Sequence, residues 1–165
     1  MNKADLLHLL PQNKEDSTRA TALAKLGYPT VAPVLDQMLD WLRTNGSPVD
    51  LVMREFFAGL GLPAIPAVRK ALRSKHGLLH HTILEHVVTQ WPGSAVEPLS
   101  SELQSLATGS GFYGTDLVAL RLLATHHLAE PKWLSEWAVF KVKRLRELLS
   151  SAEATAKLLE YRDAP

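Results

Sequence analysis

The chain contains no cysteine. This absence excludes disulfide bonds, thiolate metal sites and cysteine-based catalysis together. The chain also has almost no excess charge, because 18 basic residues stand against 17 acidic ones and leave a formal charge of +1 at pH 7. An attraction of the whole protein to nucleic acid or to an anionic membrane therefore has little support in the composition.

Long hydrophobic runs are missing as well. The opening segment "MNKADLLHLLPQNKED" has an apolar stretch too short and too interrupted for a signal peptide. No stretch approaches the roughly 18 apolar residues of a membrane-spanning helix. We therefore expect a cytoplasmic protein with no membrane partner. The length of 165 residues and the 46% share of hydrophobic residues fit one globular domain, 1–165.

The apolar residues repeat with the period of an α-helix. In the segment 31–42 they form one stripe, made of Val31, Val34, Leu35, Met38, Leu39 and Leu42. A similar stripe, with Lys141 at one of its positions, runs through 134–149. No segment sustains a period of two, so we expect no β-strand. The predicted fold class is all-α.

Glycine, proline and capping residues divide this pattern into helices. Ser47 before Pro48 and Asp16 are expected to cap helices, and Ser94 with Glu97 has the spacing of a capping box. The expected helices span approximately 16–26, 30–44, 47–61, 63–74, 77–90, 94–108, 115–129 and 131–150.

One phrase occurs twice, as "LGYPTVAPV" from Leu26 and as "LGLPAIPAV" from Leu60, a shift of 34 residues. The pattern returns near Trp91, 31 residues later. A helix–turn–helix unit with this period cannot bury its apolar face alone, so successive units stack into a solenoid. We predict a short right-handed α-solenoid of about four HEAT-like helical pairs. Its repeats are expected at approximately 13–46, 47–75, 76–108 and 112–150, with a C-terminal tail at 151–165.

Several phrases also resemble a family of small bacterial proteins of unknown function with HEAT-like helical folds. They are "LLPQNKED" (9–16), "LGYPTVAPVL" (26–35), "DWL" (40–42), "SPV" (47–49), "LGLPAIPAVRKAL" (60–72) and "ILEHVV" (83–88). The Leu-Leu-Pro-x-Asn-Lys-x-Asp opening and the Leu-Gly-Tyr-Pro turn are its clearest parts. The resemblance covers about residues 6–106, and it implies a fold without implying a reaction.

Two motifs could indicate a nucleotide-binding loop and a metal site, but the structure expected around each motif argues against that function. "GSGFYG" at 109–114 satisfies Gly-x-Gly-x-x-Gly, but a dinucleotide-binding loop must follow a β-strand, and here a helix is expected. The segment 76–86 holds a histidine cluster, in which His76 and His80 are separated by one helical turn and His81 lies about 100° around the axis. One helix does not close a metal site with these ligands, so we expect no metal and keep His76, His80 and His81 as weak candidates.

A basic run, "KVKRLR" at 141–146, offers a nucleic-acid interpretation. Lys141, Arg144 and Arg121 would join Arg69, Lys70 and Arg73 in a basic strip, similar to that of HEAT-like DNA glycosylases. The even charge balance opposes this, so the run is interpreted as the solvated face of a helix on which Lys141 extends its ammonium to the surface. Nucleic-acid binding remains the alternative function.

The favoured hypothesis is a non-enzymatic protein-interaction module of adaptor, inhibitor or immunity type, with no cofactor. In an α-solenoid the second helix of each pair lines the concave face. The polar positions expected to contact a protein partner there are Asp36, Asp40, Arg43, Arg69 and Arg73. Their mixed signs suit a charged protein surface better than a polyanion.

Overall fold

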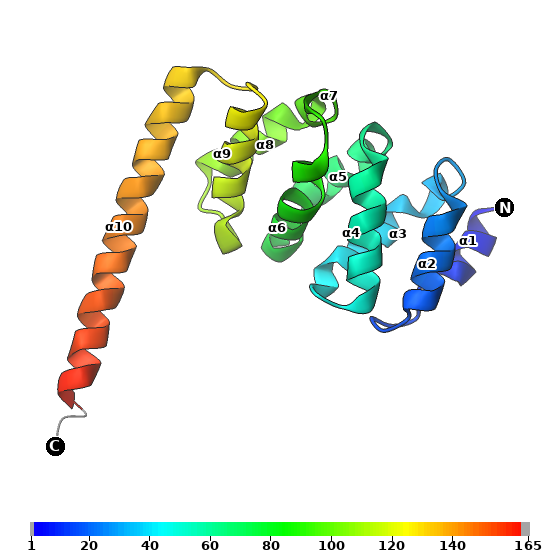
Figure 1. The fold of residues 1–165 in the computed structure, drawn as a ribbon, viewed down its shortest axis with the longest axis horizontal. Helices are drawn as coiled ribbons and strands as arrows, with labels where there is room; N and C mark the ends of the chain where they lie inside the picture. The colour runs from blue at the N-terminus through cyan, green and yellow to red at the C-terminus, as the bar shows by residue number, and fades with distance from the viewer. Residues whose placement is uncertain (1, 163–165) are drawn as a thin grey trace.

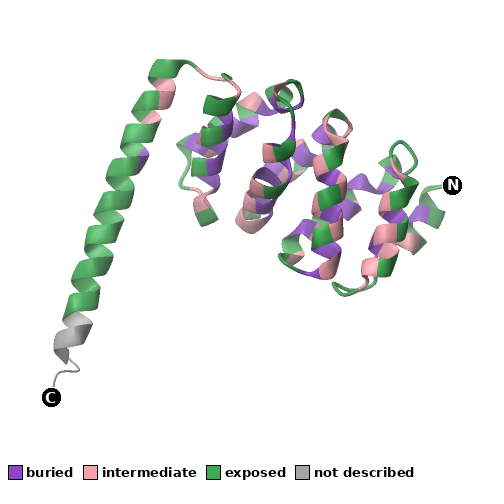
Figure 2. Ribbon diagram, viewed as in Figure 1, coloured by how far each residue is buried: buried purple, intermediate pink, exposed green. Residues whose placement is uncertain are grey.

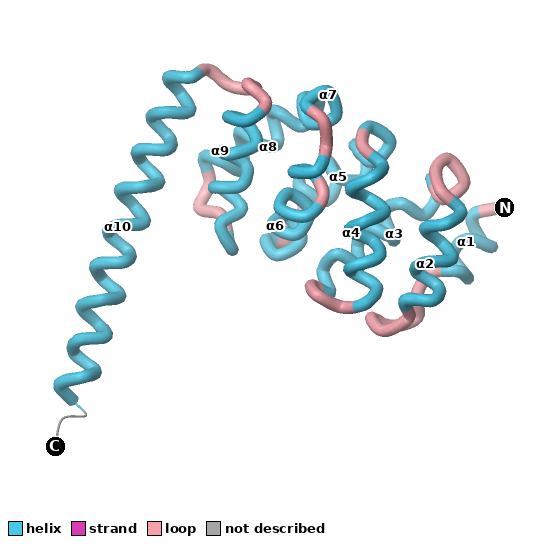
Figure 3. Tube along the Cα trace, viewed as in Figure 1, coloured by secondary structure: helices cyan, strands magenta, loops and turns pink. Residues whose placement is uncertain are grey.

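A computed structural model describes residues 2–162, except for the side chains of Phe112 and 158–162. Over this range every regular element is helical and no strand occurs (Figure 3). The predicted all-α class is confirmed. The α-helices are α1 (Lys3–Leu9), α2 (Ser17–Leu26), α3 (Leu35–Asp40), α4 (Pro48–Leu60), α5 (Ile65–Leu72), α6 (Gly77–His86), α7 (Gly93–Val96), α8 (Ser100–Thr108), α9 (Thr115–Thr125) and α10 (Pro131–Arg162). Short 3-10 segments are η1 (Ala32–Val34), η2 (Trp41–Thr44), η3 (Leu62–Ala64), η4 (Val88–Gln90), η5 (Glu97–Leu99) and η6 (Phe112–Gly114).

The helices form two rows. The first row is α2, α4, α6 and α9, in which each helix contacts the next (Figure 1). The second row lies behind it and holds α3, α5, and α8 with its 3-10 lead-in η5; α3 contacts α5, and α5 contacts η5. Helix α1 contacts α2 and η1 at one end of the rows. The two rows place side chains from distant parts of the sequence beside each other.

The predicted repeat phrase lies at the turns between the two rows. Gly27 and Gly61 follow α2 and α4 with φ angles of 67° and 64°, a region that glycine adopts without a steric penalty. The apolar residues five positions after the start of each phrase are Val31, Ile65 and Val96, and all three are buried. Each of the first two phrases therefore ends a helix at its glycine, and the apolar residue five positions after the start of each phrase packs in the core.

The core lies between the rows (Figure 2). The predicted stripe of 31–42 is buried throughout, and Val31, Val34, Met38 and Leu42 have no exposed surface. Trp91 is 2% exposed, and its Nε1 donates a hydrogen bond of 3.0 Å to the carbonyl of Phe57, 34 residues earlier. A buried indole N–H needs such a partner, and this bond links Trp91 to the last turn of α4.

Several boundaries differ from the sequence-based expectation. The expected helix 30–44 is divided into η1, α3 and η2, and the one at 94–108 into α7, η5 and α8. Proline within the first turns explains this, because Pro33 and Pro98 lack the N–H that a continuous helix requires. The capping box of Ser94 and Glu97 is wrong, since α7 follows Pro92 with no side-chain cap. Asp16 and Ser47 do cap α2 and α4 as predicted.

The C-terminal boundary at 150 was also wrong. Helix α10 continues without a break through the expected tail, and it extends away from the two rows (Figure 1). The last expected residues, 163–165, lie outside the described range. Among the described helices, none is by itself long and apolar enough to cross a membrane. Pro48–Leu60 and Leu62–Leu72 reach that length and composition only as a pair bent by 116°.

Candidate functional site

Four of the five residues predicted to bind a partner lie on the second row or directly after α5, and the fifth, Arg43, lies on η2, which follows α3. Asp36 and Asp40 lie on α3, Arg43 on η2, Arg69 on α5, and Arg73 directly after α5. Each of their side chains is at least one-third exposed. They are also all engaged in ion pairs, so the face they form is a connected surface rather than a set of free charges.

The α3 end of this face carries two ion pairs. Lys70 on α5 contacts the carboxylate of Asp36 on α3, and the hydrogen bond to Asp36 raises the pKa of Lys70. Arg43 donates to Asp40 at 2.8 Å within one turn. The first pair links α3 with α5, whereas the second is local.

The other half of this face is centred on Glu102, which lies on α8. Its side chain is 7% exposed and accepts hydrogen bonds from Arg73 at 2.6 Å and from Ser101 at 3.0 Å. Arg69 Nε lies 3.3 Å from the same carboxylate, and its guanidinium also donates to the carbonyl of Pro98. Burial by itself raises the pKa of Glu102, but the bonds from Arg73 and Ser101 and the charge of Arg69 outweigh it, so the pKa lies below its usual value.

A shallow cleft of about 420 Å³ borders this cluster. It is lined by Leu72, Arg73, Ser101, Glu102, Ser105 and Leu106. Two guanidinium groups share one carboxylate here, which leaves one positive charge uncompensated within the cluster. The Arg73 side chain is 67% exposed although its partner is buried, so the carboxylate holds a cation at the surface. Such an arrangement suits the recognition of an anionic group.

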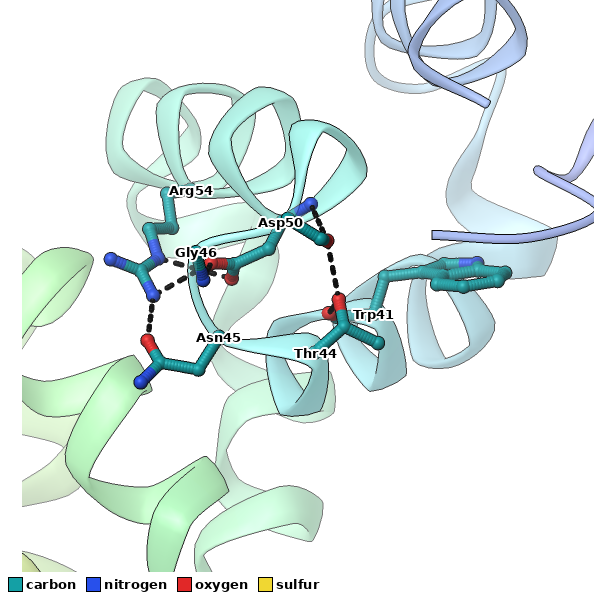
Figure 4. A network of polar contacts seen from close by, with 7 residues as sticks. Trp41, Thr44, Asn45, Gly46, Asp50 and Arg54 are labelled. Atoms are coloured by element: carbon teal, nitrogen blue, oxygen red, sulfur yellow. Dashed lines mark hydrogen bonds and ion pairs between the residues drawn. The ribbon is translucent and has the colours of Figure 1, made fainter. Parts of the chain in front are cut away.

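A buried polar network between the turn after η2 and the start of α4 was not predicted from the sequence (Figure 4). Asp50 on α4 is fully buried, and its carboxylate lies 2.6 Å from Arg54 and accepts a 2.6 Å hydrogen bond from the N–H of Gly46. Arg54 also donates to the side-chain oxygen of Asn45 at 2.5 Å. Ser47 accepts from the N–H of Asp50 at 3.1 Å, which caps α4. The network fixes the turn 44–50.

A sequence signal for this network existed. Ser47 and Asp50 have the spacing of an N-terminal capping pair, and Arg54 follows Asp50 by four residues, which is the distance of one helical turn. The sequence did not indicate that Asp50 is buried, because α6 and the turn 44–50 cover this side of α4 only in the folded chain.

The histidines do not converge on a common point. His80 is buried, and its Nε2 lies 3.1 Å from the carbonyl of Ala71. His76 precedes α6 and is exposed, and His81 faces the ring of His86 at 6.4 Å. Within the part of the chain that the structure describes, no three His, Asp or Glu side chains are grouped as metal ligands. Burial lowers the pKa of both His80 and His86.

The basic residues of the predicted strip have separate partners. Arg121 on α9 lies 2.6 Å from Glu85 on α6, in the first row, and Arg144 lies 3.3 Å from Glu147. Lys141 was wrongly placed on a solvated face. It is 7% exposed, and its ammonium lies 2.6 Å from Asp116 and donates to the carbonyl of Gly109. The structure thus brings Arg69, Lys70 and Arg73 together and leaves the other three elsewhere.

The glycine-rich segment 109–114 follows α8, so the strand that a dinucleotide-binding loop requires is not there. Gly111 approaches Asp116 so closely that a Cβ would lie 2.5 Å from the Asp116 N–H nitrogen. Gly114 has a φ of 75° directly before α9, and Asp116 faces Lys141 instead of capping the helix. The loop therefore attaches α10 to the end of the two rows.

The described residues define an all-α protein whose best-formed polar site lies on the second row. The family model that matches the chain is DUF5071, a domain of unknown function, and the match spans residues 9–111. Because this is more than half of the chain, the chain belongs to that family. The predicted resemblance to a family of unknown function is confirmed to this extent. No curated protein matches the chain. The matched range ends at the glycine-rich loop, so it contains Glu102 and its arginines and excludes α9 and α10.

Proposed function

We propose that the chain is a short right-handed HEAT-like α-solenoid that binds a protein partner and catalyses no reaction. The second row, α3, α5 and α8, is its binding face and the concave side of the solenoid. This proposal is supported by charged side chains on α3, on η2 after it and at α5, which are exposed except for the half-buried Arg69: Asp36, Asp40, Arg43, Arg69 and Arg73. A role as adaptor, inhibitor or immunity protein fits this size and architecture by analogy.

The observation that carries the proposal is the Glu102 cluster. Arg73 donates a hydrogen bond to the buried carboxylate of Glu102, and Arg69 forms an ion pair with the same carboxylate, which restricts the rotamers of both arginines before any partner arrives. Arg73 and Glu102 line a cleft of about 420 Å³, and the two arginines together leave one positive charge uncompensated. A partner's acidic side chain or terminal carboxylate fits this charge and shape, because guanidinium groups bind carboxylates through two parallel hydrogen bonds.

The two ion pairs at α3 provide a second part of the face, in which acidic side chains can contact basic groups of the partner. Asp36 and Asp40 are 47% and 59% exposed, and each retains carboxylate surface beyond its own cation. A partner with a basic group about one repeat away from its acidic group matches both halves of the face. Complementary charges of this kind contribute chiefly to specificity and to the association rate.

The test begins with the tagged full chain and a lysate of the native host, with and without nuclease. We expect one stoichiometric protein that survives nuclease treatment. Its affinity for the purified chain is then measured by titration calorimetry. The double variant Arg69→Ala/Arg73→Ala is expected to weaken binding by tenfold or more, since removal of desolvated charged contacts costs about 2–5 kcal/mol.

The matched control is Arg121→Ala. Arg121 is also more than half exposed and also pairs with a carboxylate from a neighbouring repeat, but it lies on the first row. Equal weakening by both variants would contradict the assigned face. Recovery of nucleic acid, or of proteins that disappear with nuclease, would contradict protein binding and favour the nucleic-acid alternative.

A further inference from the structure

Helix α10 leaves the two rows at a fixed point. Lys141 is buried, lies 2.6 Å from Asp116 on α9, and has its ammonium 5.8 Å from the ring centre of Trp137. Trp133 and Leu134, earlier on α10, are half-buried against the core. After Lys141 every described side chain of α10 is exposed (Figure 2). Because 132–162 contains neither proline nor glycine, nothing in the sequence favours a break that would return this part to the core.

The exposed part of α10 carries an apolar seam with a seven-residue period. At spacings of four and three residues lie Ala138, Val142, Leu145, Leu149, Ala152 and Ala156, all exposed. This is the spacing by which one helix packs along another in a coiled coil. Leu145 and Leu149 are 49% and 59% exposed. Leu145 also lines a cleft of about 580 Å³ together with Lys141, Asp116 and Leu117, so the first part of the seam borders the side of α10 that contacts α9.

The residues of the seam alternate in size in a way that fits an antiparallel copy of the same helix. When Leu149 of one copy lies beside Ala152 of the other, Leu145 lies beside Ala156, and the symmetry repeats both contacts. Each large side chain then meets a small one, so the helices pack without the voids that two opposed alanines leave. The size pattern is therefore self-complementary.

The charges beside the seam fit the same register. Arg146 and Glu153 lie on one edge of the seam, seven residues apart, and both are exposed. In the antiparallel register Arg146 of each copy faces Glu153 of the other, which gives two attractive pairs. A parallel pairing opposes Ala152 to Ala152 and Ala156 to Ala156, and it does not bring Arg146 beside Glu153 of the other copy. Size and charge thus both favour the antiparallel arrangement.

We propose that α10 is a self-association helix, through which two copies of this chain form an antiparallel, two-fold symmetric dimer centred between Ser150 and Ser151. The two serines lie on the outer side of the pair. In such an isologous contact the same surface is used by both copies, so it closes at two chains. The proposal is independent of the function proposed for the second row.

The first test measures the mass of the full chain in solution by sedimentation velocity at concentrations up to about 100 μM. We expect a dimer, and we expect Leu145→Glu to shift it to a monomer with an unchanged helical circular dichroism spectrum. Arg146→Glu and Glu153→Arg are each expected to raise the dimer Kd by about tenfold, because two attractive pairs become repulsive. The double variant Arg146→Glu/Glu153→Arg is expected to restore dimerisation. Lys143→Glu, an equal charge change on exposed surface outside the seam, is the matched control.

The second test fixes the orientation and uses the absence of cysteine in the natural chain. A mixture of Leu149→Cys chains and Ala152→Cys chains is oxidised gently. The antiparallel register predicts mixed disulfides between the two variants. Disulfides formed chiefly between two Leu149→Cys chains would overturn the register. A wild-type chain that stays monomeric, or a charge-reversed double variant that does not recover, would overturn the proposal.

Discussion

Arg73 directly after α5 and Glu102 on α8 are 29 residues apart in the sequence, and their side chains meet at 2.6 Å. The carboxylate is 7% exposed, whereas the guanidinium is 67% exposed. One partner thus belongs to the core and the other to the surface. This asymmetry connects the packing of α5 against α8 with the electrostatics of the face that we propose for binding. A substitution of Glu102 is therefore expected to change the free energy of unfolding, whereas a substitution of Arg73 is expected to change the affinity for a partner.

Replacing Glu102 by Gln removes the charge that Arg69 and Arg73 share. The two guanidinium groups then repel each other beside a neutral amide, and we expect a loss of about 1–3 kcal/mol in the free energy of unfolding at pH 7. Urea denaturation measures it. Glu97→Gln, the same chemical change at an exposed position, is the control and should change stability by less than about 0.5 kcal/mol.

The same carboxylate gives a dependence on pH. The pKa of Glu102 is lower in the folded state than in the unfolded state, so the unfolded chain binds more protons in the interval between the two values. The stabilisation is complete above the unfolded pKa and is lost as the pH falls towards the folded one. We expect the difference between wild type and Glu102→Gln to shrink on acidification over that interval. A constant difference would contradict the charged role of Glu102.

Asp50 and Arg54 on α4 form a buried ion pair beside the turn 44–50, with side chains 0% and 14% exposed. Asp50→Asn leaves Arg54 without a counter-charge and weakens the acceptor for the Gly46 N–H. We expect a loss of about 3–5 kcal/mol in the free energy of unfolding, the usual cost of breaking a buried pair from one side. Glu55→Gln, five residues further along α4 and exposed, provides the comparison. Similar small effects for both variants would show that the pair does not hold the turn.

His80 predicts a second, separate pH effect. Burial lowers its pKa, so in the pH range just below 6.5 the unfolded chain binds more protons than the folded one. The chain therefore loses stability as the pH falls through this range. His80→Gln should make the fall in melting temperature between about pH 7 and pH 5 shallower, although His86, whose pKa is also lowered, keeps part of it. The exposed His8→Gln should leave the slope unchanged.

The sequence predicted those parts of the fold that depend on local patterns. The stripe of 31–42, the caps at Asp16 and Ser47 and the repeated glycine stop all depend on residues within one or two helical turns of each other, and all are present in the structure. The broken second helices follow from Pro33 and Pro98, whose positions were visible but whose effect was underestimated. The solenoid remains a proposal, and the confirmed caps, glycine turns and buried stripe support it.

The parts that the sequence did not predict depend on contacts between distant residues. Nothing near Glu102 in the chain indicates that Arg69 and Arg73 meet it, because the pairing arises only when α5 packs against α8. The wrong prediction for Lys141 also arises from a contact with a distant residue. Its place in an apolar stripe suggested a side chain extended to solvent, whereas Asp116, 25 positions earlier, provides a buried partner. The candidate binding residues stay a prediction, and the ion pairs that they form with Lys70, Glu102 and each other were not foreseen.

Lys141 carries the last prediction, which concerns how α10 is held. Its ammonium contacts Asp116 and the carbonyl of Gly109, so Lys141→Met leaves a nearly buried carboxylate without its cation. We expect a loss of about 3–5 kcal/mol in the free energy of unfolding. Hydrogen exchange should also become faster in α9 and in 131–141, because the clamp between these segments is gone. The variant Lys143→Met removes a neighbouring exposed lysine and should alter neither quantity. If Lys141→Met leaves exchange at α9 unchanged, the ion pair is not what attaches α10, and Trp133 and Leu134 alone provide the contact.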